Sequence, residues 1–300
     1  MTDFKRITKE DFQIIDKYFA FHLEARDESR FCDYAPGTVK MWCEAYKMEY
    51  AVEGDIMLLR ARYDEENGTS YLMPIGRNAK NCAKLLVDRI KNEKSVTFSV
   101  MNKEFAALLR IELSVDESQI FADRDWSDYI YLREEFCNPS GKKHHNYKYN
   151  LNRFKKDHPN AKVEQLTEKN AQEAADFYIE YCKNNPDSSS VDDHEFHVTL
   201  PVILAPWEYS MTGAVLRSNG RIIGLTLGEV YGDTVIVHTE KAEKEIPGAY
   251  QTLALGYQLM QPETVKYINR EEDMGLEGLR RSKLSYGPLR LEHKYTLYYR

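Results

Sequence analysis

The amino-acid sequence predicts an α+β protein of two similar halves, each with a mixed, mostly antiparallel sheet flanked by helices. Its 300 residues exceed the usual span of one compact core. The order of helical and β-type patterns in the first half recurs in the second. In each half a β-rich run ends in Asn, a basic residue and Glu, at 102–104 and at 269–271. A helical stretch and an aromatic strand then follow, so a duplicated unit explains the pattern.

The elements of each half follow from hydrophobic spacing, with period 3.6 for helices and period 2 for strands. In the first half this predicts, in order, a helix, a β-meander, a helix, a strand with its helix, and an aromatic strand, at 9–22, 48–76, 78–93, 94–110 and 127–136. The second half gives the same order, at 168–185, 209–242, 248–260, 265–281 and 291–300.

A basic segment joins the halves. The stretch "GKKHHNYKYNLNRFKK", residues 141–156, holds six Lys or Arg and two His without an acidic residue, in a chain of net charge −7. Tyr147, Leu151 and Phe154 fall at i, i+4 and i+7, which predicts a helix with one apolar face. We therefore expect an N-terminal domain at 1–138, a junction helix at 139–158 and a C-terminal domain at 159–300.

The basic helix has two interpretations. A solvated linker helix is one. The other starts from Lys142 and Lys143, which we expect in the first turn, where the helix dipole disfavours cations. A ligand phosphate or carboxylate would supply the missing negative charge, so an anion site is the second interpretation.

Composition excludes several classes. No apolar run approaches the roughly 20 residues of a membrane span, and the amino terminus lacks a signal peptide, so a cytoplasmic location is expected. The five scattered Cys predict neither a disulfide framework nor a zinc site. The run "DDHEFH" at 192–197 is a weak metal candidate beside a plain surface loop, and no metal is predicted. Nucleophile-elbow, P-loop and dinucleotide motifs are missing.

Three motifs carry a family resemblance. The stretches are "GKKHHNYKYNLNRF" at the junction, "HTEKAEKEIPGAYQ" after a strand, and "YINREEDMGLEGLRRSKLSYGP" near the end. Together they resemble the soluble domain of the phosphatidylglycerol lysyltransferases and its free-standing relatives. The resemblance covers the second half and the junction, whereas the first half is similar only in layout. It implies two tandem GNAT-like (acyl-CoA N-acyltransferase-like) domains, with the active site in the C-terminal one.

The resemblance also implies functional residues. Those expected along an anionic substrate path are Lys142, Lys143, His145, Asn152 and Arg153. Those expected in the reaction cleft are Glu240, Lys241, Gly248, Tyr250 and Gln251. Those expected to close the cleft are Asn269, Arg270, Glu271, Glu272 and Asp273.

Acyl transfer needs a base, and Glu240 is the leading candidate, with Asp273 and Glu272 behind it. Strand alternation in "VHTEKA" predicts that His238 and Glu240 share one face. The plain alternative is an ion pair between Glu240 and Lys241 at the strand end.

Two further side chains have candidate roles. Tyr250, at a helix start, is suited to protonate a leaving group or hold a substrate hydroxyl, and plain packing is the alternative. Arg270 is suited to bind a phosphate or carboxylate, with an ion pair to a neighbouring Glu as the alternative.

These observations predict an acyl- or aminoacyltransferase. The resemblance favours aminoacyl-tRNA as donor and a small amine or hydroxyl, or a lipid headgroup, as acceptor. No cofactor is firmly implied, because "EKEIPGAYQ" has one Gly where a loop cradling the coenzyme A pyrophosphate needs closer backbone approach. An acetyl-CoA-dependent N-acetyltransferase and a non-catalytic module that binds tRNA or another anion are the alternatives.

Overall fold

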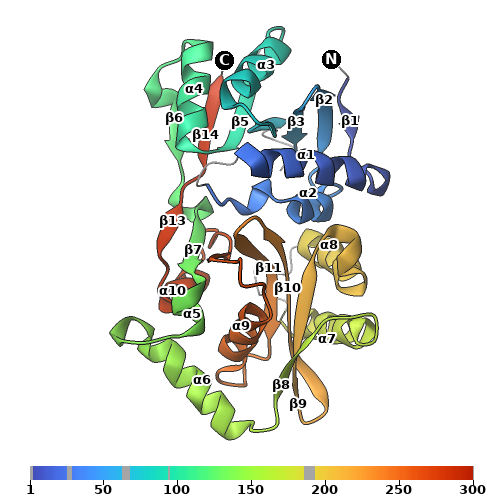
Figure 1. Ribbon diagram of the computed structural model, residues 1–300, viewed down its shortest axis with the longest axis vertical. Helices are drawn as coiled ribbons and strands as arrows, with labels where there is room; N and C mark the ends of the chain where they lie inside the picture. Colours follow the sequence, from blue (N-terminus) through green and yellow to red (C-terminus); the bar gives the residue numbers. More distant parts are fainter. Residues whose placement is uncertain (1–2, 26–28, 63–67, 94, 186–192, 300) are drawn as a thin grey trace. The chain divides into compact units, whose positions relative to one another are not determined.

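Two units, each built on a seven-stranded mixed sheet, make up the part of the chain that the computed structural model describes, residues 3–25, 29–62, 68–93, 95–185 and 193–299. One unit comprises residues 1–127 together with 292–300, and the other comprises 128–291. Figure 1 follows the chain through both units. Within the described residues, no helix is both long and apolar enough to cross a membrane.

The first unit has the strand order β1-β2-β3-β4-β5-β14-β6. Its strands are β1 (Lys5–Arg6), β2 (Glu49–Glu53), β3 (Ile56–Ala61), β4 (Ser70–Leu72), β5 (Val96–Met101), β6 (Ile120–Ala122) and β14 (Tyr295–Tyr299). Its helices are α1 (Phe12–Ala25), α2 (Pro36–Trp42), α3 (Ala79–Ile90) and α4 (Lys103–Leu113). The pair β4 and β5 is parallel, whereas the pairs β1–β2, β2–β3, β3–β4, β5–β14 and β14–β6 are antiparallel.

The second unit has the order β13-β7-β12-β11-β10-β9-β8. Its strands are β7 (Asp128–Leu132), β8 (Lys162–Gln165), β9 (Thr212–Ser218), β10 (Arg221–Tyr231), β11 (Thr234–Ala242), β12 (Tyr267–Asn269) and β13 (Arg290–Glu292). Its helices are α5 (Arg133–Cys137), α6 (His145–Asp157), α7 (Ala171–Asn184), α8 (Asp193–Leu204), α9 (Ala249–Leu259) and α10 (Glu277–Ser285). Here β11 and β12 form the parallel pair.

The predicted repeat is visible in the two strand orders, which match position by position. In both sheets four antiparallel-paired strands are followed by one parallel step, from β4 to β5 and from β11 to β12. The next strand in each sheet comes from the other half of the sequence: β14 lies between β5 and β6, and β7 lies between β12 and β13. Figure 1 shows the red strand β14 inside the first unit's blue-green sheet.

This strand exchange changes the predicted domain boundaries. The expected N-terminal domain, 1–138, includes β7 and α5, which belong to the second unit. The expected C-terminal domain, 159–300, includes β14, which belongs to the first. The junction helix also has a place in one unit, because α6 packs against α9. The aromatic strands were recognised as strands, but the sequence pattern carries no signal of which sheet each one joins.

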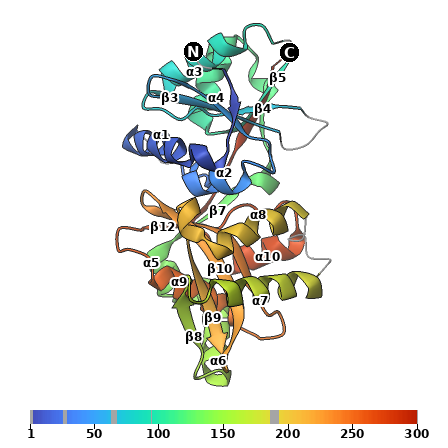
Figure 2. The ribbon, with the colours of Figure 1, turned by 90° about the vertical axis from the view of Figure 1, so that its right-hand side faces the viewer.

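Helices cover both faces of the second sheet. On one face α9 packs against β9, β10 and β11, and α5 and α6 pack against α9. The apolar core there includes Tyr131, Tyr147, Val237, Tyr257 and Tyr286. On the other face α7 packs against β10 and β11, and α8 packs against α7; Figure 2 shows these two helices in front of the sheet.

Candidate active site

A β-bulge in β11 decides which side chains reach the two faces. Leu227 of β10 lies opposite Thr239, but its neighbour Gly228 lies opposite Val237, which leaves His238 as an extra residue. A bulge re-aims the side chains around it. Glu240 therefore lies on the α9 face, whereas His238 lies on the opposite face. The prediction that these two share a face is wrong, because strict alternation fails at the bulge.

His238 is held between two carboxylates. Its Nε2 lies 2.9 Å from Glu229 Oε1, and its Nδ1 lies 2.8 Å from Glu271 Oε1. Only 1% of the His238 side chain is exposed. Burial lowers the pKa of this imidazole, but the two carboxylates outweigh burial and raise the pKa to about 10. His238 is therefore a buried cation that anchors Glu271, whose φ is +56°.

On the α9 face, Glu240 forms a nearly buried ion pair with Arg270. Arg270 Nη2 donates to Glu240 Oε1 over 2.5 Å, and the two side chains are 11% and 9% exposed. Burial raises the pKa of Glu240, and the nearby Arg270 opposes that rise. The predicted alternative partner, Lys241, points to the other face, where its ammonium lies 2.8 Å from Glu195.

Aromatic rings surround the guanidinium of Arg270. Its Cζ lies 4.2 Å from the centre of the Tyr286 ring, 5.9 Å from that of Phe136 and 6.0 Å from that of Tyr131. The Tyr147 ring lies 4.9 Å from the Tyr286 ring. Rings at these distances stabilise a cation and keep water out, so charges in this site interact strongly.

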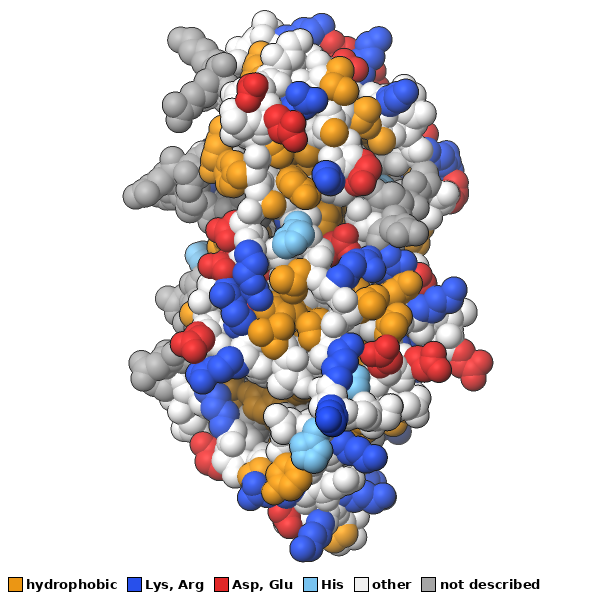
Figure 3. All heavy atoms as spheres, turned by 90° about the vertical axis from the view of Figure 1, so that its left-hand side faces the viewer, with side chains coloured by type: hydrophobic (Ala, Val, Ile, Leu, Met, Phe, Trp, Pro, Cys, Tyr) orange, Lys and Arg blue, Asp and Glu red, His pale blue; other side chains and the backbone are white. Residues whose placement is uncertain are grey.

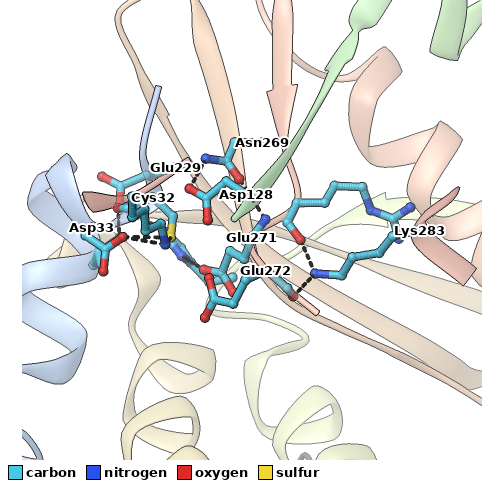
Figure 4. Close-up of polar contacts among 12 residues, drawn as sticks. Cys32, Asp33, Asp128, Glu229, Asn269, Glu271, Glu272 and Lys283 are labelled. Atoms are coloured by element: carbon cyan, nitrogen blue, oxygen red, sulfur yellow. Dashed lines mark hydrogen bonds and ion pairs between the residues drawn. The ribbon is translucent and has the colours of Figure 1, made fainter. Parts of the chain in front are cut away.

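The segment that carries Arg270 is fixed by its neighbours. Asn269, fully buried, donates to Asp128 over 2.7 Å and accepts from the backbone N–H of Glu271 over 2.7 Å. Lys283 of α10 donates to the carbonyl oxygens of Arg270 and Glu272. Figure 4 shows both sets of contacts. Asn269 and Glu272, predicted to bind substrate, thus shape the segment through an amide and a main-chain carbonyl.

Asp273, the second predicted base, is completely buried. It accepts from the Tyr129 hydroxyl over 2.6 Å, from two nitrogens of Arg280 and from the N–H of Gly275. Both carboxylate oxygens already receive donors, so Asp273 ties β7 and α10 to the segment. Its geometry suits a structural role better than proton transfer.

Gly248 precedes α9 with φ of +86°. A Cβ at this position would lie 2.3 Å from the Asn150 carbonyl oxygen and 2.7 Å from Phe154 Cβ. Helix α6 therefore lies directly on the backbone at the start of α9, the place where a coenzyme A pyrophosphate loop would lie. Gly248 thus allows close packing between two helices, and its contact with substrate stays a prediction.

Two further predicted site residues, Tyr250 and Gln251, lie in α9 and have different surroundings. The Tyr250 hydroxyl lies 2.9 Å from the Tyr181 hydroxyl of α7, and burial raises the pKa of Tyr250. Gln251 is partly exposed one position later. Tyr250 therefore keeps its proton and links α9 to α7.

A cavity of about 520 Å³ opens beside this tyrosine pair, between α7, β10 and the segment after β11. Tyr181 and Phe177 form an aromatic wall. Its other lining residues include five carboxylates and two cations: Glu173, Asp176, Glu180, Glu243, Glu245, Arg221 and Lys244. Acidic groups thus outnumber basic ones around the opening.

The junction helix has the predicted two faces. Tyr147 and Phe154 are buried, and the exposed face carries Lys142, Lys143, His145, Lys148, Asn152, Arg153, Lys155 and Lys156. Figure 3 shows Lys and Arg side chains on the side of the second unit that includes this helix. One detail differs from prediction: α6 begins at His145, and Lys142–His144 forms a preceding 3-10 turn. Lys143 there lies 3.2 Å from Glu135, so part of its charge is neutralised.

The aromatic partners of Arg270 were missed in the sequence. Tyr131 lies in a predicted strand, Tyr286 lies between two predicted elements, and Tyr147 was assigned only to the packing face of the helix. The alternation in "DYIYL" marked β7 as a strand but gave no hint of a cation beneath it. The two His of the weak metal candidate, His194 and His197, lie in α8; Asp192 is outside the described residues.

The two sheets share one strand order with a parallel step at the same place, so the chain consists of two tandem units of the GNAT-like fold. The family model of the phosphatidylglycerol lysyltransferase C-terminal region matches residues 27–298. The chain belongs to this family, at whose level the reaction is aminoacyl-tRNA-dependent transfer. The resemblance seen in the motifs is confirmed, and the match extends it into the first half.

Solved structures share this fold. A conserved protein of unknown function from Bacteroides thetaiotaomicron VPI-5482 has a TM-score of 0.88 and 31% identity, and each chain covers 100% of the other. L-PGS from Bacillus licheniformis has a TM-score of 0.64 and 15% identity, with 95% of this chain and 91% of that chain covered. The C-terminal domain of a putative lysylphosphatidylglycerol synthetase from Agrobacterium fabrum has a TM-score of 0.64 and 12% identity, with 94% and 91% covered. These last two likenesses bear on the fold alone. A search of curated proteins finds no match.

Proposed function

We propose that this protein transfers an aminoacyl group from aminoacyl-tRNA to a small amine or hydroxyl acceptor, with Glu240 and Arg270 at the reaction centre. The observation that carries the proposal is their nearly buried ion pair, 2.5 Å long and walled by aromatic rings. A carboxylate whose pKa is raised by burial is a better general base than an exposed one. A fixed guanidinium stabilises negative charge that develops beside it.

The acceptor attacks the aminoacyl ester directly, so no covalent enzyme intermediate is formed. The acceptor nitrogen or oxygen attacks the aminoacyl carbonyl carbon, and Glu240 takes the proton that the acceptor loses. The ester bond to the terminal ribose then breaks, and the ribose oxygen takes that proton. Tyr250 is a second source for the leaving-group proton, because burial keeps its hydroxyl protonated.

The exposed face of α6 supports RNA as the donor's carrier. Its cations are spaced along one helix and point into solvent, as a surface that contacts successive phosphates requires. Coenzyme A is less well supported. The backbone at the start of α9, which would cradle its pyrophosphate, lies against the Asn150 carbonyl oxygen.

The acidic cavity supports an amine as the acceptor. An excess of carboxylates beside the Tyr181 and Phe177 rings favours a cationic group. Tyr181, in the cavity wall, is hydrogen-bonded to Tyr250. The charge of Glu240 contributes to raising the pKa of Tyr250. A small ammonium compound held there would lie beside the Tyr181–Tyr250 pair. A lipid headgroup that carries an amine or hydroxyl fits the same chemistry.

The test is enzyme-dependent loss of radiolabelled amino acid from bulk charged tRNA, with and without a panel of small amines. We expect release that amines accelerate, with the label recovered in a new amide. Binding without any release would instead identify a non-catalytic tRNA-binding module. If the protein instead transferred only the acetyl group of acetyl-coenzyme A, aminoacyl-tRNA would not be the donor.

The role of α6 is tested with Lys148→Glu/Lys155→Glu. We expect this variant to bind tRNA at least tenfold more weakly at low salt and to show a shallower salt dependence, because each lost phosphate contact reduces the slope. The matched control is Lys80→Glu/Lys84→Glu, which reverses two exposed charges in α3. Equal weakening in both variants would mean that net charge alone governs binding.

A further inference from the structure

Two hydrogen-bonding atoms beside Glu240 are buried without a protein partner. They are the Tyr147 hydroxyl oxygen and Arg270 Nη1. Tyr147 is 2% exposed, and the Arg270 side chain is 11% exposed. Both groups pack on the same ring, since Tyr286 lies 4.9 Å from the Tyr147 ring and 4.2 Å from the Arg270 guanidinium.

Both atoms act as donors here. A guanidinium can only donate. The Tyr147 hydroxyl keeps its proton because burial raises its pKa, although Arg270 nearby opposes that rise. Glu240 also acts on the Tyr147 pKa, so all three groups share one small electrostatic environment. A buried donor without an acceptor costs stability, so an ordered water or a ligand usually supplies the acceptor.

We propose that Tyr147 and Arg270 form the oxyanion-binding pair of this active site, receiving the carbonyl oxygen of the aminoacyl ester. The inference rests on the proposed function and adds Tyr147 as a catalytic residue. When the acceptor attacks, the electron pair of the C=O bond moves onto this oxygen, where the hydroxyl and Nη1 donate to it. When the ester bond breaks, the pair returns to the carbonyl, and the released ribose oxygen takes the proton held by Glu240.

The two terminal nitrogens of the Arg270 guanidinium have different roles. Arg270 uses Nη2 to hold Glu240 and leaves Nη1 for the substrate. Base and oxyanion site are thus coupled through one planar group, which fixes their relative position. Lysine cannot reproduce this arrangement, because it lacks the rigid fork.

The experiment compares Tyr147→Phe with wild type in single-turnover release of amino acid from charged tRNA. We expect the rate to fall about 10²- to 10³-fold, the usual effect of removing one oxyanion donor, with unchanged affinity for tRNA. The melting temperature should stay equal or rise, because an unsatisfied buried hydroxyl has been removed. If Tyr147 had only a structural role, the substitution would lower the melting temperature and the rate together.

Two variants serve as comparisons. Tyr178→Phe removes another buried hydroxyl from the same unit, in α7, and should leave the rate unchanged. Arg270→Lys should slow release at least as much as Tyr147→Phe. A Tyr147→Phe rate within twofold of wild type would show that the hydroxyl holds only water, and the inference would be wrong.

A second arm separates this inference from the proposed function. Calorimetry with a panel of amino-acid amides, which carry the carbonyl but no tRNA, needs no turnover. Wild type should bind at least one amide, and Tyr147→Phe should bind it at least tenfold more weakly. If wild type releases no amino acid yet this difference is seen, the proposed function fails and the carbonyl subsite stands. If wild type binds none of the amides, the subsite fails.

Discussion

Arg270 joins two groups that come from distant parts of the second unit: its Nη2 donates to Glu240 of β11 over 2.5 Å, and its guanidinium lies 4.2 Å from the Tyr286 ring beyond α10. Neither contact alone explains a charge at this depth. The carboxylate balances the charge, and the ring replaces water on one face of the guanidinium. A buried ion pair contributes little net stability relative to an apolar replacement, so a gain in stability does not explain this pair.

The first prediction concerns Glu240→Gln. Glutamine keeps an oxygen that accepts from Arg270 but cannot take a proton at neutral pH. We therefore expect kcat to fall about 10²- to 10⁴-fold, the usual contribution of a general base. Stability should fall by about 1–3 kcal/mol, because Arg270 loses its counter-charge. Single-turnover release and urea unfolding measure the two effects.

The matched control for Glu240→Gln is Glu164→Gln. Glu164, on β8, pairs with Arg217 over 3.1 Å and is 39% exposed. The same chemical change there should alter stability by less than about 1 kcal/mol and leave the rate unchanged. An unaltered rate in Glu240→Gln itself would remove Glu240 from the role of base.

The second prediction concerns Gly248→Ala. The added Cβ would meet the Asn150 carbonyl oxygen at 2.3 Å, and the φ of +86° disfavours any side chain. Because this carbonyl oxygen belongs to the backbone of α6, that helix must move away from α9. We expect a loss of about 3 kcal/mol or more in the free energy of unfolding, measured by urea denaturation.

Gly220→Ala separates the two causes of this loss. Gly220 has φ of +79° but nothing within 4 Å of the position of a Cβ. Only the backbone cost applies there, about 1–2 kcal/mol. Equal losses at the two positions would mean that the contact between α6 and α9 contributes nothing.

Much of the fold was predictable because it depends on the spacing of hydrophobic residues within single helices and strands. The order of helices and strands, the duplication and the buried residues of α6 all follow from spacing within one element, and all are confirmed. The exchange of β7 and β14 was not predictable, because aromatic strands of the same pattern fit either sheet.

In the candidate site, too, individual residues were predictable, whereas their contacts with one another were not. Glu240 and Arg270 were named from motifs, but their pairing depends on the bulge at His238, an irregularity that period-2 reasoning cannot detect. Tyr147 was missed for a related reason. Its ring satisfies the apolar pattern of the helix, and only the finished packing reveals that its hydroxyl lies buried near a cation.

The third prediction concerns pH. The pKa of His238 is about 10 in the folded protein against an ordinary 6.5. A raised folded pKa means that the charged imidazole stabilises fully below about pH 6.5 and that this stabilisation is lost as pH rises through about 10. His238→Gln should thus be about 3 kcal/mol or more less stable than wild type at pH 6, with a smaller difference at pH 10. Urea unfolding at both pH values measures it.

His145→Gln is the control for this pH dependence, since His145 is exposed at the start of α6. Its effect on stability should be small at both pH values. A His238→Gln deficit that stays constant from pH 6 to pH 10 would contradict a charged His238 between Glu229 and Glu271.

The last prediction follows from the strand exchange. A fragment of residues 128–291 contains every strand of the second sheet except the final residue of β13, including β7, whose register places Tyr131 opposite Ile268 of β12. A fragment of residues 159–300 lacks β7 and α6 and exposes the edge of β12, with the rings of Tyr131 and Tyr147 missing from its core. We expect the first to melt cooperatively and the second to aggregate or melt without a transition, as followed by circular dichroism. Cooperative melting of 159–300 would mean that β7 is dispensable and that the boundary read from the sequence describes an independent domain.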